Sequence, residues 1–178
     1  MVSFTVPMRD PWCCMRLGET KMTTPLHKVF VLRHADMFRE PPRELTPYGI
    51  FQAHRVGEAL ARLGYKHIVL SSPYARCVQT AEIIAEHVNA MPVEQRDILR
   101  EYEGAESDEE MVERAEDILR MACDLFEYNP IIISHREPIR AMAAVVFNRD
   151  RKKIAIPKAG GFVLDFGLSS QYINAKMY

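Results

Sequence analysis

The chain has 178 residues, of which 48% are hydrophobic and 26% are charged, and its formal net charge is −1. This length suits one domain that buries its own core, and the composition is that of an ordinary globular protein. The nearly neutral charge gives no basis for broad electrostatic binding to nucleic acid or to an anionic membrane, so we expect neither as a partner.

The first 27 residues differ from the rest of the sequence because they mix proline, glycine, tryptophan and two adjacent cysteines without a sustained hydrophobic period. We interpret residues 1–27 as an N-terminal extension: a packed arm, a tail or a product of start-site choice. Residues 28–178 form the predicted functional domain. The sequence shows no secretory signal and no apolar run of the ~20 residues that span a membrane, so we expect a cytoplasmic location. The four cysteines lack the spacing of a zinc site or a disulfide framework, which predicts free thiols.

Strand and helix patterns alternate from residue 28 onward. Short apolar runs predict buried strands, and longer stretches with apolar residues on one side predict amphipathic helices. In chain order we expect a strand at 29–32, a helix from 47 to 63, a strand at 67–70, helices at 78–88 and 108–128, a strand at 131–133, a helix from 138 through 146 and a strand at 162–166. This alternation predicts an α/β fold, a three-layer α/β/α sandwich with a mainly parallel sheet.

The ends of two helices carry specific signals. Thr46 is a favourable N-cap, Pro47 suits the first helical position, and Gly64 is a stop signal. Asp108 is the expected cap of the long helix. The apolar face of the first helix is expected to carry Tyr48, Phe51, Val56, Leu60 and Leu63.

Polar side chains that suit phosphate chemistry follow three of the predicted strands. In an open α/β sheet ligands bind beyond the carboxyl ends of the strands, so we expect these groups to converge. Arginine matches phosphate oxygens with a planar fork of donors, and histidine acts as a nucleophile or an acid–base group. The groups are Arg33 and His34 after the first strand, Ser72 and Arg76 after the second, and His135 after the third.

Four segments resemble motifs of the histidine phosphatase (phosphoglycerate mutase-like) superfamily, in its small phosphatase branch. Residues 31–35, Val-Leu-Arg-His-Ala, resemble the Arg-His-Gly signature, and residues 44–49 resemble the Leu-Thr-x-x-Gly stretch. Residues 71–81 are similar to the Ser-Ser-Pro-x-x-Arg-x-x-Gln-Thr-Ala block. Residues 133–135 resemble the strand that delivers the second histidine, and Ile139-Arg140 follows at the usual interval.

The resemblance runs in order from Lys28 to about Phe166 and implies a phosphoglycerate mutase-like fold. It also implies roles for individual residues. His34 would become phosphohistidine, Arg33 and Arg76 would bind the phosphoryl oxygens, and His135 would complete this phosphate-binding set as a donor. Such a cluster needs neither a metal nor a cofactor, because phosphoryl transfer depends mainly on positioning and charge stabilisation.

The leaving oxygen also needs a proton. The superfamily often provides it from a glutamate in a Leu-x-Glu segment, and Glu101 in Leu99-Arg100-Glu101 fits this pattern, with Asp36 as the rival acid. This role requires a raised pKa for Glu101, which the neighbouring Glu103 and Glu106 would assist and the arginines would oppose.

Three positions leave alternatives open. Ala35 replaces the usual glycine after the nucleophile, which is tolerable if its φ is negative. Arg136 stands where many relatives have glycine, and it either adds a cation for the substrate or turns outward. Ser72 either contributes a hydroxyl to the site or caps the following helix, and we favour the cap.

We therefore expect a phosphatase that acts without metal on phosphomonoesters or phosphohistidine through a covalent phosphohistidine. Its substrate would be a phosphorylated small molecule or a phosphoprotein. Only 33 residues separate Glu101 from His135, which argues against the longer insertions of phosphoglycerate mutases. A mutase-type phosphoryl transfer and a non-catalytic phosphate-binding module are the alternatives.

Overall fold

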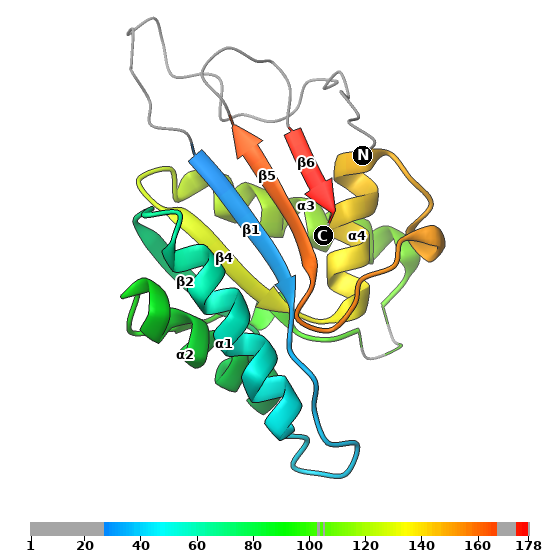
Figure 1. Cartoon of the computed structure of the whole chain (residues 1–178). Helices are drawn as coiled ribbons and strands as arrows, with labels where there is room; N and C mark the ends of the chain where they lie inside the picture. The colour runs from blue at the N-terminus through cyan, green and yellow to red at the C-terminus, as the bar shows by residue number, and fades with distance from the viewer. Residues whose placement is uncertain (1–26, 103, 105, 167–173, 178) are drawn as a thin grey trace, which may run out of the picture.

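A computed structural model describes residues 27–102, 104, 106–166 and 174–177 of the chain. These residues form one six-stranded sheet with helices on both faces (Figure 1). The strands are β1 (His27–Arg33), β2 (His67–Ser71), β3 (Glu94–Gln95), β4 (Asn129–Ser134), β5 (Gly161–Phe166) and β6 (Asn174–Met177). The helices are α1 (Pro47–Ala61), α2 (Ala75–Val88), α3 (Asp108–Asp124) and α4 (Arg136–Phe147), with short 3-10 helices η2 (Asp97–Leu99) and η3 (Arg151–Lys153).

The strand order is β3-β2-β4-β1-β5-β6. Strands β3, β2, β4 and β1 are mutually parallel, whereas β5 is antiparallel to β1. Arg33 lies beside Ser134, and Ser71 lies beside Ile133, so the central strands end at the same edge. Because β5 runs in the opposite direction, the loop that precedes it also lies at this edge. The predicted three-layer sandwich with a mainly parallel sheet is confirmed.

Alternate side chains of each strand enter the two layers of the core, as the pleat of a strand requires. Val29 and Val31 of β1 pack with α3 and α4, whereas Phe30 packs on the side of α1 and α2. In β4, Ile132 joins the first layer and Ile131 the second. Figure 1 shows the same arrangement, with α1 and α2 on one face of the sheet and α3 and α4 on the other.

Helix α1 begins as predicted, but only part of the expected apolar face is buried. Thr46 is the N-cap, and its hydroxyl oxygen accepts a 3.0 Å hydrogen bond from the Gly49 N–H. Tyr48 and Phe51, expected in the core, are 61% and 58% exposed. The buried residues are the predicted Leu60 together with Gly49, Ala53 and Gly57. A Cβ at Gly49 would overlap the carbonyl of Asp36, so the first turn of α1 lies too close to the segment after β1 for any side chain at this position.

The other helices differ from expectation at their ends. Ser107, not Asp108, is the N-cap of α3, because its hydroxyl and the Glu110 carboxylate form a reciprocal capping box. This helix ends at Asp124 rather than at residue 128. Helix α4 begins at Arg136, and Pro138 is tolerated in its first turn, where no N–H has an intrahelical partner. No helix in the described ranges is long and apolar enough to cross a membrane.

Candidate active site

The ends of β1, β2 and β4 bring the predicted polar groups together. The His34 N–H donates to the Ser134 carbonyl at 3.0 Å, and the Ser72 N–H donates to the Ile133 carbonyl at 3.0 Å. These bonds continue the sheet by one residue beyond the strand ends. As a result, the rings of His34 and His135 lie side by side, with their centroids 5.4 Å apart and their planes at 59°.

His34 is held in a defined tautomer. Its Nδ1 lies 2.8 Å from the Ala35 carbonyl oxygen, which can only accept, so Nδ1 carries the proton. The Nε2 of the neutral ring then has a free lone pair. Burial, followed by the charges of Lys158, Arg76 and Arg33, lowers the pKa of His34 to about 3, so the ring stays neutral around pH 7.

The segment after His34 is tied to helix α2. Ala35 has no left-handed φ, so the methyl group that replaces the usual glycine hydrogen causes no backbone strain. The Ala35 N–H donates to the Thr80 hydroxyl at 3.1 Å, and that hydroxyl donates to the Arg76 carbonyl at 2.6 Å. These bonds fix the backbone of the histidine segment to the helix turn that carries Arg76.

The second histidine is fully buried and has a polar partner at each ring nitrogen. His135 Nε2 lies 2.8 Å from the Ser72 hydroxyl, and Nδ1 lies 3.2 Å from Arg76 Nη2. Since a guanidinium can only donate, Nδ1 accepts, and Nε2–H of the neutral ring donates to Ser72. Burial, then the charges of Arg76 and nearby groups, lowers the pKa of His135 to about 2.

Ser72 therefore contributes its hydroxyl to the site. The interpretation of Ser72 as the cap of α2 is wrong, because Tyr74 is the N-cap residue and no side chain accepts a capping hydrogen bond there. The sequence did not lead us to predict Tyr74 as a residue of the site. Its ring packs edge-on against His135 at 5.2 Å between centroids, and the Arg76 guanidinium lies 4.9 Å from the ring centroid.

Glu101 joins the cluster from the loop after η2. Its Oε2 forms an ion pair with Arg76 and lies 3.8 Å from His135 Nδ1, and its side chain is 41% exposed. Asp36, the rival acid, accepts a 2.9 Å hydrogen bond from the Thr46 hydroxyl at the start of α1. Glu106 pairs with Arg114 at 2.7 Å, and Glu103 lies outside the described residues.

The loop before β5 forms the remaining side of the site. Arg33 Nη1 donates to the Ile156 carbonyl at 2.9 Å, and the Ala159 N–H donates to the His34 carbonyl at 3.2 Å. Between them, Lys158 is half-buried, and its charge acts on His34 more strongly than those of Arg76 and Arg33. Sequence reasoning missed Lys158, since it predicted the strand at 162–166 but not the antiparallel direction of that strand.

Two further groups border the cluster. Arg136 is exposed and pairs with Glu137 at 2.9 Å. Its charge still reaches the site, because burial and then the charge of Arg136 lower the pKa of Arg33, so both alternatives for Arg136 stay open. The buried thiol of Cys77 lies 3.4 Å from His135 Nε2, and burial raises its pKa to about 12. No group of three or more His, Cys, Asp or Glu side chains in the described residues could hold a metal ion.

The family model of the histidine phosphatase superfamily (branch 1) matches residues 18–105, which include Arg33, His34, Arg76 and Glu101. The chain belongs to the histidine phosphatase superfamily. This member is 36% identical over 98 residues to the mitochondrial serine/threonine-protein phosphatase PGAM5 of Mus musculus. The match covers 52% of this chain and 34% of that protein, so the chain spans about a third of the length of this curated relative.

Solved structures share the fold of this superfamily member. A phosphoserine phosphatase variant from Entamoeba histolytica, in complex with phosphoserine, has a TM-score of 0.67 at 15% identity and covers 84% of this chain and 95% of its own. A mycobacterial glucosyl-3-phosphoglycerate phosphatase has a TM-score of 0.66 at 17% identity, covering 86% of this chain and 97% of its own. The predicted phosphoglycerate mutase-like fold is confirmed.

Proposed function

We propose that the protein is a phosphatase that hydrolyses phosphomonoesters, or phosphohistidine, through a covalent phosphohistidine on His34. The observation that carries this proposal is the state of the His34 ring. It is neutral, its proton is held on Nδ1 by the Ala35 carbonyl, its Nε2 keeps a lone pair, and the charges of Lys158, Arg76 and Arg33 act on the ring. A neutral imidazole nitrogen beside guanidinium groups is suited to attack a phosphorus atom.

In the first step, His34 Nε2 attacks phosphorus, the Nε2–P bond forms and the P–O bond to the leaving group breaks. Arg33 and Arg76 stabilise the charge on the equatorial phosphoryl oxygens. The leaving oxygen takes a proton from Glu101, which must be protonated in the substrate complex, where the phosphoryl group replaces it as the partner of Arg76. In the second step, the Glu101 carboxylate takes a proton from water as the water oxygen attacks phosphorus. The Nε2–P bond breaks, inorganic phosphate leaves, and neutral His34 and protonated Glu101 are restored.

His135 is proposed to complete the phosphate site as a donor. In the free enzyme its Nδ1 accepts from Arg76, so this role requires protonation of the ring when substrate binds. The two negative charges of a phosphoryl group favour that protonation, because an adjacent opposite charge stabilises the cationic ring. Ser72 then keeps the ring oriented through its bond to Nε2.

The related proteins support a hydroxyl-linked phosphate as substrate. The PGAM5 relative is a serine/threonine-protein phosphatase, and the Entamoeba structure holds phosphoserine. We therefore propose that this protein removes phosphate from a phosphorylated small molecule or a phosphoprotein. Positive charge at the reacting phosphate would come from arginine side chains, so turnover should persist after treatment with EDTA. Loss of activity with EDTA and its recovery with a divalent ion would contradict this proposal.

The nucleophile is tested by trapping the intermediate. The wild-type protein, incubated briefly with a ³²P-labelled phosphomonoester and quenched in alkali, should carry acid-labile label, because phosphohistidine is stable to base. His34→Ala should carry no label and show no turnover, while circular dichroism shows an unchanged fold. His54→Ala, which removes an exposed histidine of α1, is the matched control and should be labelled like the wild type. Wild-type turnover by His34→Ala would refute the mechanism.

A further inference from the structure

Lys158 is a charged residue of the site with no assigned role. It is half-buried in the loop between η3 and β5, and it forms no ion pair with any described residue. The charged groups that act on it are Arg33 and Arg76, which repel it, and Asp36 and Glu101, which attract it. Lys158 is therefore placed among the residues of the phosphate site and not on the outer surface.

The position of Lys158 is fixed by the backbone around it. On its C-terminal side, the Ala159 N–H donates to the His34 carbonyl at 3.2 Å, and the Gly160 carbonyl accepts from the Arg33 N–H at 2.9 Å. On its N-terminal side, the Ile156 carbonyl accepts from the Arg33 side chain at 2.9 Å. The loop is thus bound on both sides of Lys158 to the dipeptide that carries the nucleophile.

Gly161 makes this close attachment possible. A Cβ at this position would overlap the Val31 carbonyl, so β5 can begin directly against β1 only because residue 161 is glycine. Since β5 is antiparallel to β1, the residues just before it lie beside the residues just after β1. This topology places Lys158 at the edge where the carboxyl ends of the parallel strands meet.

The charges of the site indicate which ligand Lys158 binds. Both histidines are neutral in the free protein, and Glu101 offsets the charge of Arg76 through their ion pair. Arg33 and Lys158 also act on His34, and neither forms an ion pair with a described residue. A phosphomonoester carries a charge of about −1.5 to −2 at pH 7 because its second pKa is about 6. Without Lys158, Arg33 would be the one cation acting on His34 that has no ion-pair partner among the described residues.

We infer that Lys158 is the third cation of the phosphate site and that its ammonium group binds an oxygen of the phosphoryl group attacked by His34. This inference rests on the proposed function. A lysine is a flexible point charge with three donors, so it can follow the phosphoryl oxygens as they move toward the transition state. The planar guanidinium of Arg33, held by Ile156, is more restricted.

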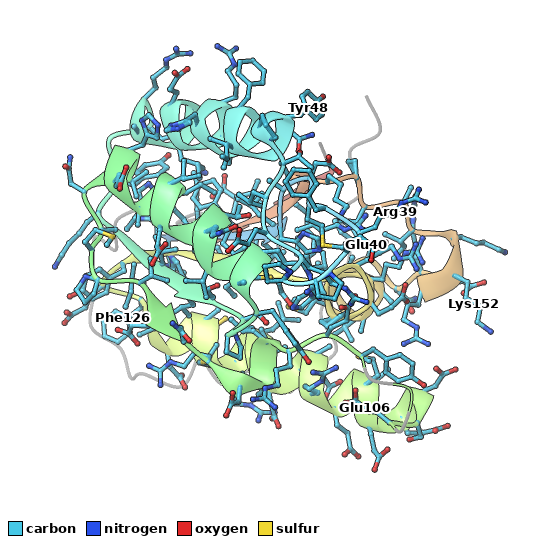
Figure 2. All side chains as sticks on the ribbon, turned by 90° about the horizontal axis from the view of Figure 1, so that it is seen from below. Arg39, Glu40, Tyr48, Glu106, Phe126 and Lys152 are labelled. Carbon is cyan, nitrogen blue, oxygen red and sulfur yellow. The ribbon has the colours of Figure 1, made fainter. Side chains whose placement is uncertain are left out.

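The direct test measures binding of inorganic phosphate by isothermal titration calorimetry. Lys158→Met should weaken binding about tenfold or more, because a charge-assisted hydrogen bond to phosphate is lost. Lys158→Arg should retain most of the affinity. Lys152→Met is the matched control, since it removes an exposed lysine of η3 that points away from the body of the molecule in Figure 2, and it should bind like the wild type. Equal affinity of Lys158→Met and wild type would overturn the inference.

A second test separates the phosphoryl group from the leaving group. If Lys158 binds the transferred phosphoryl group, Lys158→Met should lower kcat/KM for p-nitrophenyl phosphate and for O-phosphoserine by similar factors. Loss with O-phosphoserine alone would overturn the inference, because Lys158 would then bind the carboxylate of the leaving group. If the wild type neither binds phosphate nor forms phosphohistidine, the proposed function itself fails. Phosphate binding by wild type with no effect of Lys158→Met rejects only the role of Lys158.

Discussion

Removal of the Ser72 hydroxyl is a sharp test of how the site is held together. Ser72 and His135 are both fully buried, and their 2.8 Å hydrogen bond is the polar contact that fixes the Nε2 side of the ring. Ser72→Ala would leave a buried imidazole N–H beside the Cys77 sulfur at 3.4 Å, which is a weak acceptor. An unsatisfied buried donor costs about 1–3 kcal/mol, so we expect a loss of that size in the free energy of unfolding.

The same substitution should lower activity. A ring that is free to turn loses its orientation toward the phosphate, and each 1.4 kcal/mol of lost transition-state binding lowers kcat/KM about tenfold. Ser71→Ala is the control, because Ser71 is equally buried but its hydroxyl donates to the Ser72 carbonyl and not to a site residue's side chain. Urea titrations of the variants measure stability, and p-nitrophenyl phosphate hydrolysis measures activity.

The two variants distinguish between a site role and a merely structural one. Ser71→Ala should lower stability with little change in kcat/KM, whereas Ser72→Ala should lower both. If Ser72→Ala loses stability but keeps full activity, its hydroxyl supports only the fold, and the orientation of His135 must be secured by Arg76 and Tyr74. If neither property changes, the reasoning from the buried hydrogen bond is refuted.

Three further predictions concern the acid, the pH dependence and the packing of α1. Glu101→Gln should slow hydrolysis of an alkyl phosphate by about 10²–10⁴-fold and that of p-nitrophenyl phosphate far less, because an alkoxide needs a proton to leave. If hydrolysis of both substrates slows equally, Glu101 has a positioning role. If neither slows, Asp36 is the acid, and the same two substrates should be measured with Asp36→Asn. Burial keeps the pKa values of His34, His135 and His67 below their ordinary value. The unfolded chain therefore binds more protons than the folded protein below about pH 6.5, so stability should fall as pH decreases from 6.5 toward 3. The urea midpoint of His67→Gln should depend less steeply on pH across this window than that of the wild type. An equally steep dependence would contradict the lowered pKa of His67. Gly49→Ala should lower the free energy of unfolding by about 1–3 kcal/mol, and with it the melting temperature, because the added methyl group overlaps the Asp36 carbonyl. An unchanged melting temperature would show that α1 can shift without cost.

The strands and the convergence of the site were predictable because their signals are local. Apolar runs end directly at Arg33-His34 and at His135, and the residues that succeed parallel strands gather at one edge of the sheet. Thr46 with Pro47 likewise marks a helix start within a few residues. These patterns do not depend on which element packs against which, so the sequence alone identifies them.

The failures concern contacts between distant segments. The apolar stripe of α1 suggested that Tyr48 and Phe51 are buried, but the close approach of Asp36 and His87 leaves no room for a side chain at Gly49 and Gly57 on the inner face. Lys158 was missed for a related reason. Its place beside His34 depends on the antiparallel direction of β5, which no local pattern reveals.

The attachment of the nucleophile to the sheet has a consequence for how this scaffold can diversify. His34, Ser72 and His135 each follow a strand by one residue, and sheet-like backbone bonds hold the first two of these positions. The loop of residues 38–44, closed by the bridge between Met37 and Leu45, consists by contrast of exposed residues, among them Arg39, which is labelled in Figure 2. Grafting a new loop there would leave the reacting atoms in register. Substrate preference could therefore be exchanged between relatives as a module, with the same phosphoryl-transfer machinery retained beneath it.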